Sequence, residues 1–397
     1  MVTDYIRERT PGTRDIVKCR EADTYTGMSK IRVFIVNRAV VMRRIISDEI
    51  KRDKELEIVG NVANEKIALS MIKHVKPDVV SMDIEMSVME GIEVVGKIRN
   101  RHPDLPIIMF STLSQRAARN TLEALSQGAN DYITIPMSSQ RVTIARQRVR
   151  EELIPKIKSL CFKIRHSAPS VLSLNQEFIT PITIPVAKTM RETRVDVLAI
   201  GVSTGGPNAL AEVLSRFPKD FPVPIVIVQH MPPIFTKCLS ERLSLKCAMS
   251  VQEGIAGRSL LPGHVWIAPG NYHMTVVQKG CRVELAINQR PQENSCRPSV
   301  DVLFRSVARV FGYRTLGLIL TGMGRDGLRG CETIRANGGQ ILAQDEVSSV
   351  VWGMPGAVVH AGLADNVLPL SAMASEIQRR VQMNRSESTV QCNLTTS

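Results

Sequence analysis

The sequence predicts an α/β protein made of two doubly wound domains, each built on a parallel β-sheet. Short apolar runs rich in β-branched residues alternate with amphipathic stretches of helical spacing, in two separate blocks of the chain. The apolar runs do not alternate with polar residues, which is typical of strands that helices cover on both faces. A length of 397 residues accommodates two domains of about 130 and 200 residues.

The first block is expected to form a domain over residues 29–153. Its strands are expected at Ile31–Val36, Glu57–Val62, Asp78–Met82 and Pro106–Phe110, with a shorter one near Tyr132. The segments between them have helical spacing, and a last helix over Ser139–Leu153 runs up to Pro155. Residues 1–28 are expected to be an N-terminal extension, with Met28 as an alternative start to Met1.

A basic linker is expected over residues 154–193, which contain a stretch of Ser, Pro and Thr with poor periodicity. The second α/β domain then covers residues 194–383. Its strands are expected at Val195–Val202, Ile225–Val228, Val265–Ala268, Leu316–Leu320 and Gln340–Ala343. The polar tail, residues 384–397, is expected to be disordered.

The composition is that of a globular cytoplasmic protein. Hydrophobic residues make up 44% of the chain and charged residues 22%, and no apolar run approaches the roughly 18 residues that cross a bilayer. We therefore expect no membrane insertion. The N-terminal region lacks the apolar core of a secretory signal, which favours the cytoplasm. The eight cysteines are scattered without a Cys-x-x-Cys pair, so we expect reduced thiols and neither a zinc site nor a disulfide framework.

The net charge of +13 is unevenly distributed. The segment from Met137 to Arg194 contains eleven Lys and Arg against four Asp and Glu, which is about half of the surplus. No recognition helix or RNA-binding signature accompanies this segment, so we expect no nucleic-acid partner. A solvated linker that steers acidic protein partners is the simpler interpretation.

A nucleophile is expected at Ser203, in the turn after the first strand of the second domain. Glycines on both sides of it allow a tight strand-to-helix turn that exposes the serine hydroxyl, and Pro207 suits the first turn of the helix that follows. The helix N-terminus offers unpaired amides for a developing oxyanion. A phosphate-binding loop is the alternative, but Gly-x-Ser-x-Gly-Gly departs from the dinucleotide pattern Gly-x-Gly-x-x-Gly.

His230 and Asp326 complete a candidate catalytic triad. His230 ends the next strand, and Asp326 lies in a glycine-rich turn after the strand Leu316–Leu320. The carboxyl ends of parallel strands share one edge of a sheet, so these side chains are expected to meet Ser203 there. A structural role is the alternative for an isolated histidine. Ser, His and Asp are the residue types needed for nucleophile, base and orienting carboxylate, although their order along the chain differs from that of ordinary α/β hydrolases.

Six blocks of the second domain form an ordered and highly specific set. They are Ile200-Gly-Val-Ser-Thr-Gly-Gly206, Gln229-His-Met-Pro232, Ile267-Ala-Pro-Gly270, Arg297-Pro-Ser-Val-Asp301, Leu320-Thr-Gly-Met-Gly324 with Asp326-Gly327, and Gly353-Met-Pro355. Through these blocks, residues 194–375 closely resemble the catalytic domain of the chemotaxis protein-glutamate methylesterases.

The resemblance implies a Rossmann-like domain in which Ser203, His230 and Asp326 are the catalytic triad. It also implies an oxyanion and substrate loop, at Thr204, Gly205 and Met323. Neither a metal nor an organic cofactor is expected to take part in catalysis.

The reaction that the resemblance implies is hydrolysis of glutamate γ-methyl esters on methyl-accepting chemotaxis receptors, with deamidation of receptor glutamines as a related activity. Both are acyl transfers in which Ser203 attacks a carbonyl while His230 takes its proton. A non-catalytic signalling adaptor that binds receptor or kinase is the competing interpretation, which the complete triad disfavours. A serine peptidase or lipase is a third interpretation, and no motif of its own supports it.

The first domain resembles the flavodoxin-like receiver that precedes this catalytic domain in the family. Asp83 fits the phosphoacceptor position and Ser111 the switch hydroxyl. Receivers carry two adjacent acidic residues that hold magnesium, but this chain has Asn37 and Arg38 there. Ile135 replaces the lysine that normally precedes the proline after the fifth strand.

These replacements predict a receiver that is not phosphorylated and that serves as a regulatory or docking domain. Arg38 is expected to pair with Asp83 in place of magnesium, and Ser87 and Glu90 also depart from the usual Pro and Asp. Weak phosphotransfer is the alternative. The chemotaxis histidine kinase is a second candidate partner beside the receptors, because the domain resembles a receiver. Bound magnesium is not expected.

Overall fold

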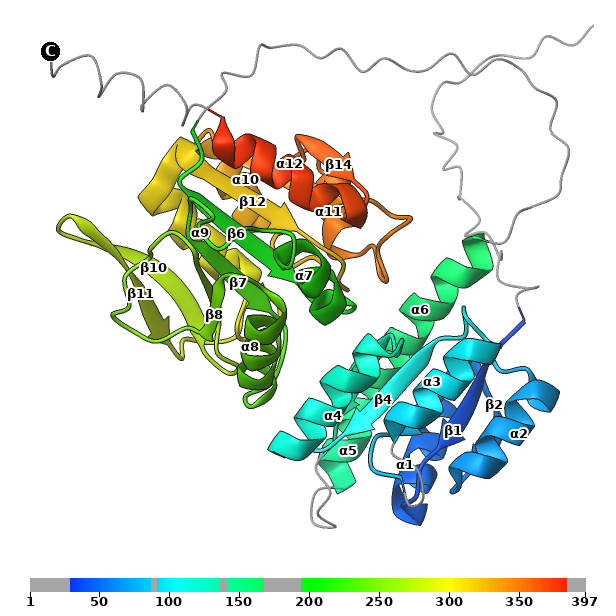
Figure 1. Cartoon of the computed structure of the whole chain (residues 1–397). Helices are drawn as coiled ribbons and strands as arrows, with labels where there is room; N and C mark the ends of the chain where they lie inside the picture. Colours follow the sequence, from blue (N-terminus) through cyan, green and yellow to red (C-terminus); the bar gives the residue numbers. More distant parts are fainter. Residues whose placement is uncertain (1–28, 87–90, 136–141, 168–193, 384–397) are drawn as a thin grey trace, which may run out of the picture.

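The computed structural model describes residues 29–86, 91–135, 142–167 and 194–383, which form two α/β domains (Figure 1). Both domains have parallel main sheets, which confirms the predicted fold class. The expected extension (1–28) and tail (384–397) lie outside the described residues, as do residues 168–193 of the expected linker. Ser87 and Glu90 lie outside them as well.

The N-terminal domain is built on a five-stranded sheet of order β2-β1-β3-β4-β5. Its strands are β1 (Ile31–Val36), β2 (Leu56–Val62), β3 (Val79–Asp83), β4 (Ile107–Ser111) and β5 (Asp131–Thr134). One face is covered by α2 (Glu65–Val75), α3 (Gly91–Arg101) and α4 (Gln115–Ser126), and the other by α1 (Val40–Ile50) and α5 (Val142–Arg148). Strands β3, β4 and β5 are buried along their whole length, including their few polar residues.

The last helix of this domain extends beyond its expected end. A π-helical turn (Val149–Leu153) follows α5, and α6 (Ile154–Ser167) continues the helix through Pro155. Proline inside a helix removes a donor and crowds the preceding turn, and the wider π turn gives its ring room. Ile157 and Leu160 are buried in the same core as α1 and α5. The first part of the expected linker therefore packs as part of the N-terminal domain.

The C-terminal domain is built on a seven-stranded sheet of order β14-β13-β12-β6-β7-β9-β8. Its strands are β6 (Val197–Val202), β7 (Ile225–Gln229), β8 (Ser250–Glu253), β9 (His264–Ile267), β12 (Thr315–Ile319), β13 (Gln340–Gln344) and β14 (Asn366–Leu368). One face is covered by α7 (Gly206–Leu214), α8 (Phe235–Lys246) and α12 (Leu370–Gln382). The other face is covered by α9 (Val300–Phe311), which a 3-10 turn (Gly312–Arg314) follows, α10 (Leu328–Ala336) and α11 (Met354–His360).

An antiparallel hairpin, β10 (His273–Lys279) and β11 (Arg282–Asn288), packs against α9 outside the main sheet. Within the sheet the chain runs from β6 to β7 on one side and returns with β12 on the other. Ligands of doubly wound sheets bind at such a reversal, beyond the carboxyl ends of the strands. A ligand or active site is therefore expected at the loops after β6, β7 and β12.

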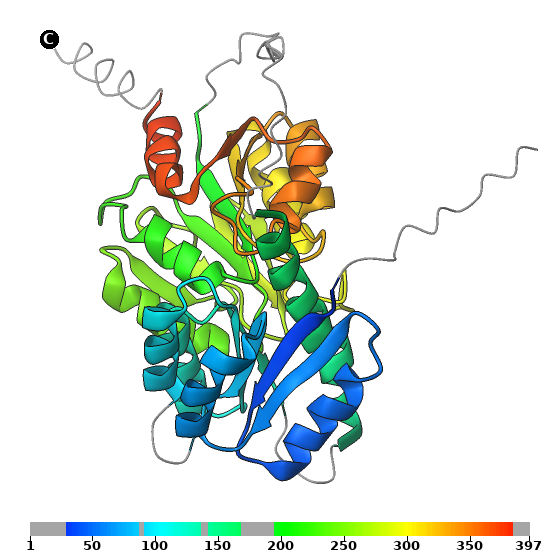
Figure 2. The same ribbon diagram turned by 90° about the vertical axis from the view of Figure 1, so that its right-hand side faces the viewer.

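The two domains pack against each other through α4 of the N-terminal domain and α7 and α8 of the C-terminal domain (Figures 1 and 2). The Arg242 guanidinium lies 2.7 Å from the Glu123 carboxylate, and the Tyr132 ring stacks on Phe235 with centroids 4.7 Å apart. Apolar contacts are continuous from one domain core to the other.

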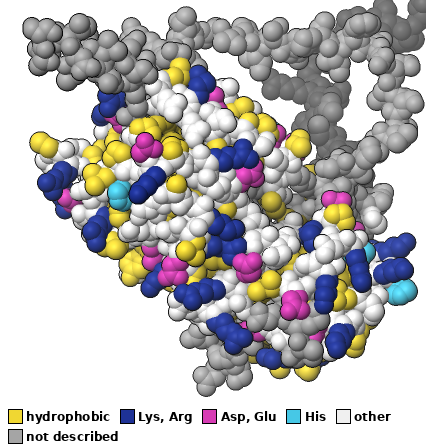
Figure 3. All heavy atoms as spheres, viewed as in Figure 1, with side chains coloured by type: hydrophobic (Ala, Val, Ile, Leu, Met, Phe, Trp, Pro, Cys, Tyr) yellow, Lys and Arg dark blue, Asp and Glu magenta, His cyan; other side chains and the backbone are white. Residues whose placement is uncertain are grey.

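Lys and Arg side chains are interspersed with Asp and Glu over the face shown in Figure 3, without a single basic patch. Two lysines of the expected basic linker are engaged within the N-terminal domain. The ammonium of Lys156 lies 2.9 Å from the Asp131 carboxylate, and that of Lys158 lies 2.9 Å from Asp53. Among the helices that the structure describes, none is both long and apolar enough to span a bilayer.

Candidate active site

Three loops at the carboxyl ends of adjacent strands bring the expected triad residues to one edge of the sheet. Ser203 follows β6, His230 follows β7, and Asp326 lies in the loop after β12. Strand β6 pairs directly with both of the other strands, so their ends lie side by side. Ser203 and His230 line one cavity, and Asp326 is hydrogen bonded to His230 behind it.

The backbone around Ser203 is held from several sides. Its N–H donates to the Thr321 carbonyl over 3.0 Å, and its carbonyl accepts from the Gly206 N–H over 2.9 Å. The side-chain amide of Gln229 also donates to this carbonyl, over 2.9 Å. Gly205 has a φ of 80°, a left-handed conformation that favours glycine, and it precedes the first turn of α7. The glycine-rich turn thus places the serine at a helix N-terminus.

Two amides beside the serine are available to an oxyanion. Within the described part of the chain, the N–H groups of Thr204 and Gly205 donate to no carbonyl or side-chain acceptor. The Thr204 hydroxyl is already engaged, because it donates to Asp131 of the N-terminal domain over 2.7 Å. Met323 does not line the cavity over Ser203, and its sulfur instead accepts a hydrogen bond from a hydroxyl in α6.

His230 and Asp326 form the central hydrogen bond of the site. The distance from His230 Nε2 to Asp326 Oδ2 is 2.8 Å. Burial disfavours the charged form of Asp326, but the hydrogen bond and charge of His230, with donation from Val300 N–H and the Ser299 hydroxyl, lower its pKa to about 2. Burial also opposes a charge on His230, yet the contacts with Asp326 and Cys296 raise its pKa to about 10. Asp326 is therefore an ionised partner that fixes the ring.

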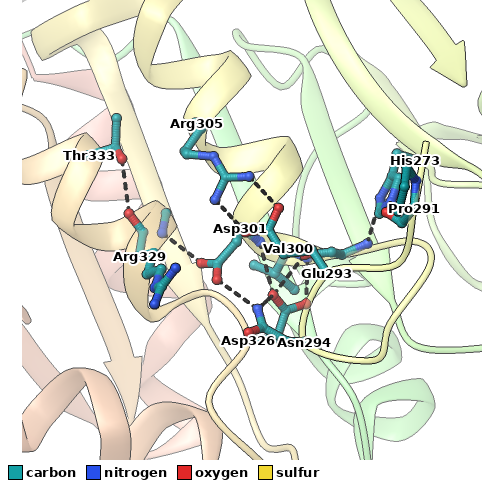
Figure 4. Close-up of polar contacts among 12 residues, drawn as sticks. His273, Pro291, Glu293, Asn294, Val300, Asp301, Arg305, Asp326, Arg329 and Thr333 are labelled. Carbon is teal, nitrogen blue, oxygen red and sulfur yellow. Dashed lines mark hydrogen bonds and ion pairs between the residues drawn. The ribbon is translucent and has the colours of Figure 1, made fainter.

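A buried polar cluster holds the carboxylate of Asp326 in place (Figure 4). The amide of Asn294 donates to Asp326 Oδ1 over 2.7 Å and to Asp301 Oδ2 over 2.8 Å, so it bridges the two carboxylates. The other oxygen of Asp301 accepts from the N–H groups of Gly327 and Gly330. Burial raises the pKa of Asp301. The cluster thus ties the loop after β12 to the N-terminal end of α9.

The turn that carries Asn294 is itself anchored. Asn294 has a φ of 53°, in the left-handed region. Beside it, Glu293 accepts from both terminal nitrogens of Arg305, over 2.7 and 2.6 Å. The Nε2 of His273 lies 3.0 Å from the Pro291 carbonyl at the start of the turn (Figure 4). Charged and backbone hydrogen bonds therefore compensate for the less favourable backbone conformation.

Cys296 is a side chain of the site that the sequence did not indicate. Its Sγ lies 3.8 Å from His230 Nδ1, and within 4.8 Å of a carboxylate oxygen of Asp326. The hydroxyl of Ser203 forms no hydrogen bond with the described residues. In this arrangement the free side of the imidazole faces the thiol and the cavity. Cys296 and Asn294 both lie just before the block Arg297-Pro-Ser-Val-Asp301, which is the one sequence signal that marks their position.

The cavity over the site has a volume of about 450 Å³, and both domains line it. The C-terminal domain contributes Ser203, Thr204 and His230, and the N-terminal domain contributes Asp131 and Tyr132 of β5. Asp131 is tied to both domains, since it accepts from Thr204 and from Lys156 of α6. The N-terminal domain therefore forms one wall of the candidate active site.

The receiver-like site is located at the end of β3. Asp83 is 9% exposed, and its Oδ1 accepts from the Glu85 N–H over 3.1 Å. Burial, with the nearby charge of Glu85, raises the pKa of Asp83 to about 6, although Arg38 opposes the shift. Ser111 lies at the end of β4, where its hydroxyl accepts from Thr121 over 2.8 Å.

The residues around Asp83 differ from the pair of adjacent carboxylates that holds magnesium in receivers. The side-chain oxygen of Asn37 accepts from the N–H of Ala39 over 2.9 Å, so this oxygen is engaged in a local turn before α1. Ile135 is buried in the apolar core. Arg38 is exposed, and among the described residues it forms no ion pair with Asp83, contrary to the pairing that the sequence suggested. Magnesium prefers an octahedral set of oxygen ligands including carboxylate, whereas Asn37 and Arg38 supply an amide and a guanidinium.

Comparison with known proteins gives two family matches. Residues 198–377 match the family model of the CheB methylesterase, and residues 33–146 match the response regulator receiver domain. Similar proteins include the protein-glutamate methylesterase/protein-glutamine glutaminase of Trichodesmium erythraeum (strain IMS101), which is 47% identical over 89% of this chain and 100% of that protein. The protein of the same description from Nocardioides sp. is 44% identical over 90% of this chain and 97% of its own length.

Solved structures match each domain separately. The CheB methylesterase catalytic domain of Thermotoga maritima is 38% identical to this chain, with a TM-score of 0.46. The match covers 47% of this chain and 99% of the Thermotoga maritima chain. The response regulator domain of Thermotoga maritima CheB is 36% identical to this chain, with a TM-score of 0.30. The match covers 32% of this chain and 94% of the Thermotoga maritima chain.

Proposed function

Since the chain belongs to the family of CheB-type protein-glutamate methylesterases, with an N-terminal receiver and a C-terminal methylesterase domain, we propose that it demethylates glutamate γ-methyl esters and deamidates glutamines of chemoreceptors, with Ser203, His230 and Asp326 as its triad. The observation that carries the residue assignment is the 2.8 Å hydrogen bond between His230 and the buried Asp326, on the strand edge that also carries Ser203. A non-catalytic adaptor has no need of an ionised carboxylate fixing a histidine beside a serine.

The reaction begins when Ser203 Oγ attacks the γ-carbonyl carbon of the substrate and His230 Nδ1 accepts the hydroxyl proton. The tetrahedral oxyanion is stabilised by the N–H groups of Thr204 and Gly205. Collapse breaks the bond to the methoxy oxygen, which leaves as methanol with the proton from His230. Water then attacks the acyl enzyme with His230 again as base, and this step releases glutamate and regenerates Ser203. With a glutamine substrate the leaving group is ammonia.

The test is methanol release from a methylated receptor. We expect Ser203→Ala and His230→Ala each to lower turnover by about 10⁴-fold or more, because the members of a triad act as a unit. Ser215→Ala is the matched control, since Ser215 caps the far end of α7. Near-normal turnover by a folded Ser203→Ala protein would exclude a serine nucleophile, and absence of turnover by the unchanged protein would favour the adaptor.

We further propose that the receiver regulates access to the site without phosphorylation of Asp83. The supporting observations are the cavity wall formed by β5, the replacement of the acidic pair by Asn37 and Arg38, and the buried Ile135. A phosphoryl-aspartate needs a divalent cation and a cationic side chain to stabilise it.

The experiment compares the unchanged protein with Asp83→Asn, each incubated with magnesium and a small phosphodonor or the phosphorylated kinase. We expect no covalent label and equal turnover. A label on Asp83 together with several-fold activation, lost in Asp83→Asn, would show a working receiver.

A further inference from the structure

We propose that Cys296 and His230 form a binding site for a thiophilic divalent metal ion of the zinc class, which switches hydrolysis off when it binds. The site consists of the Sγ of Cys296 and the Nδ1 of His230, and a carboxylate oxygen of Asp326 lies within 4.8 Å of the thiol sulfur. These three are the one group of closely spaced His, Cys and acidic side chains suited to a metal in the described part of the chain. The inhibitory effect rests on the proposed role of His230 as base, whereas metal binding itself does not.

The distance between the two donor atoms fits a tetrahedral ion. Zinc bonds of about 2.3 Å to sulfur and about 2.05 Å to imidazole nitrogen, at a tetrahedral angle, separate the two donors by about 3.6 Å. The distance from Cys296 Sγ to His230 Nδ1 is 3.8 Å. The observed separation of the two donors therefore exceeds the separation in a shared zinc site by only about 0.2 Å.

The hydrogen bond to Asp326 prepares the imidazole for a metal. Because His230 Nε2 donates to Asp326 Oδ2 over 2.8 Å, the lone pair of the neutral ring is on Nδ1, which faces the thiol. A carboxylate behind a metal-ligating histidine fixes the ring and increases its basicity. Asp326 is 3% exposed and accepts from Asn294, Ser299 and Val300 as well, so its position is fixed in advance.

The cavity supplies the rest of the coordination. Cys296 and His230 both line the 450 Å³ space over the site, which has room for the water ligands of a four-coordinate ion. Thiolate and imidazole are ligands that zinc and similar transition metals prefer, whereas magnesium and calcium prefer oxygen. The donor pair thus selects the zinc class over the more abundant hard cations.

Occupation of Nδ1 has a direct chemical consequence. An imidazole whose lone pair is bonded to a metal cannot accept the proton of Ser203, so hydrolysis stops until the metal leaves. Binding displaces any proton on Nδ1, and it is therefore favoured by higher pH.

The direct test is titration of the full chain with Co²⁺, which reports a thiolate ligand through a sulfur-to-cobalt charge-transfer absorption. We expect one such band per chain in the unchanged protein, and its loss in Cys296→Ser and Cys296→Ala. Cys281→Ser is the matched control, because Cys281 is an exposed cysteine of the same domain, and it should keep the band. Ser203→Ala should also keep it, which separates metal binding from catalysis.

The functional test is inhibition of methanol release by buffered Zn²⁺, with reversal by a chelator. The half-inhibitory concentration should rise at least tenfold in Cys296→Ser relative to Cys281→Ser, each compared with its own rate without metal. Absence of the charge-transfer band in the unchanged protein, or an equal band in Cys296→Ser and Cys281→Ser, would overturn the proposed site. Equal inhibition of the two variants would overturn the switch, whereas a band without any turnover would refute the proposed esterase and leave the metal site standing.

Discussion

At Asp326, several hydrogen bonds converge on one carboxylate and lower its pKa to about 2, so its charge persists over the whole physiological range. His230 beside it has a pKa raised to about 10. A base works only when it is neutral, and the neutral fraction of His230 grows as pH rises toward that value. We therefore expect kcat/KM for methanol release to increase from pH 7 toward pH 10.

Cys296 contributes to the raised pKa of His230, so Cys296→Ala should move the rise in kcat/KM to lower pH. The measurement is a pH–rate profile of each protein in metal-free buffer. A profile that is flat between pH 7 and pH 9 in the unchanged protein would contradict a protonated His230.

Asn294 donates to Asp326, so we expect it to act as a positioning residue. Its removal takes away a hydrogen bond to each of two buried carboxylates, and such charged hydrogen bonds contribute about 1.5–3 kcal/mol each. We expect Asn294→Ala to lower kcat by roughly 10- to 100-fold with little change in KM, and to shift the pH–rate profile. Asn337→Ala, at the end of α10, is the control. A purely structural role would instead lower the unfolding temperature and leave the profile in place.

The location of Ser203, His230 and Asp326 at one edge of the sheet could be predicted from sequence because each lies in a loop that follows an apolar strand, and parallel strands bring such loops together. Asn294 and Cys296 could not, because they lie in an irregular turn whose side-chain directions depend on the Glu293–Arg305 pair and on positive φ angles. The predicted ion pair of Arg38 with Asp83 is absent from the described residues, where the side chain of Arg38 is exposed and Asp83 is buried.

Among secondary-structure elements, the ten strands expected from apolar runs are present, with ends that differ by up to two residues. The strands that sequence analysis missed are β8, β10, β11 and β14, and they carry partly polar, partly exposed residues. Such strands lack the continuous apolar signal of a sheet centre. The predicted helix end before Pro155 was wrong because a π turn, which no simple sequence pattern indicates, lets the helix continue through the proline.

Helix α12 is attached to the edge of its sheet by a buried guanidinium. Arg380 is 4% exposed and donates to Gln340 of β13 over 2.6 Å, to Asn366 of β14 and to Glu376. Arg380→Met leaves these oxygens without a donor, so we expect it to lower the free energy of unfolding of the C-terminal domain by about 3 kcal/mol. The measurement is urea unfolding of the full chain.

Arg379→Met is the matched control for Arg380→Met. Its side chain is 55% exposed, so it should cost less than about 1 kcal/mol. Equal destabilisation by the two changes would show that the buried contacts of Arg380 do not anchor α12.

For the molecule as a whole, the arrangement of the two domains was not predictable, because it depends on pairs far apart in the sequence. The Arg242–Glu123 pair and the Tyr132–Phe235 stack each join residues more than a hundred positions apart. Steering by the basic linker remains a prediction. It gains no support from Lys156 and Lys158, which are paired within the N-terminal domain.

The interface between the domains is testable by charge reversal. Arg242→Glu places two carboxylates together at a partly buried contact, which should separate the domains and raise methanol release several-fold. Exchange of the two charges, with Glu123→Arg added, should restore the lower rate. Arg119→Glu should have a smaller effect, since the Arg119–Glu241 pair is 61% and 41% exposed. An unchanged rate, with an unchanged radius of gyration in solution scattering, would contradict a restrictive contact.

The wall that β5 contributes to the active-site cavity belongs to the same polypeptide as the site that it covers. A covalently attached partner is present at an effective concentration on the order of millimolar, whatever the amount of protein in the cell. A contact of modest intrinsic strength is then enough to keep the receiver against the cavity, the closed arrangement, in most molecules. Closure should therefore be independent of dilution, and a receiver supplied as a separate fragment should restrain the esterase domain only near millimolar concentration.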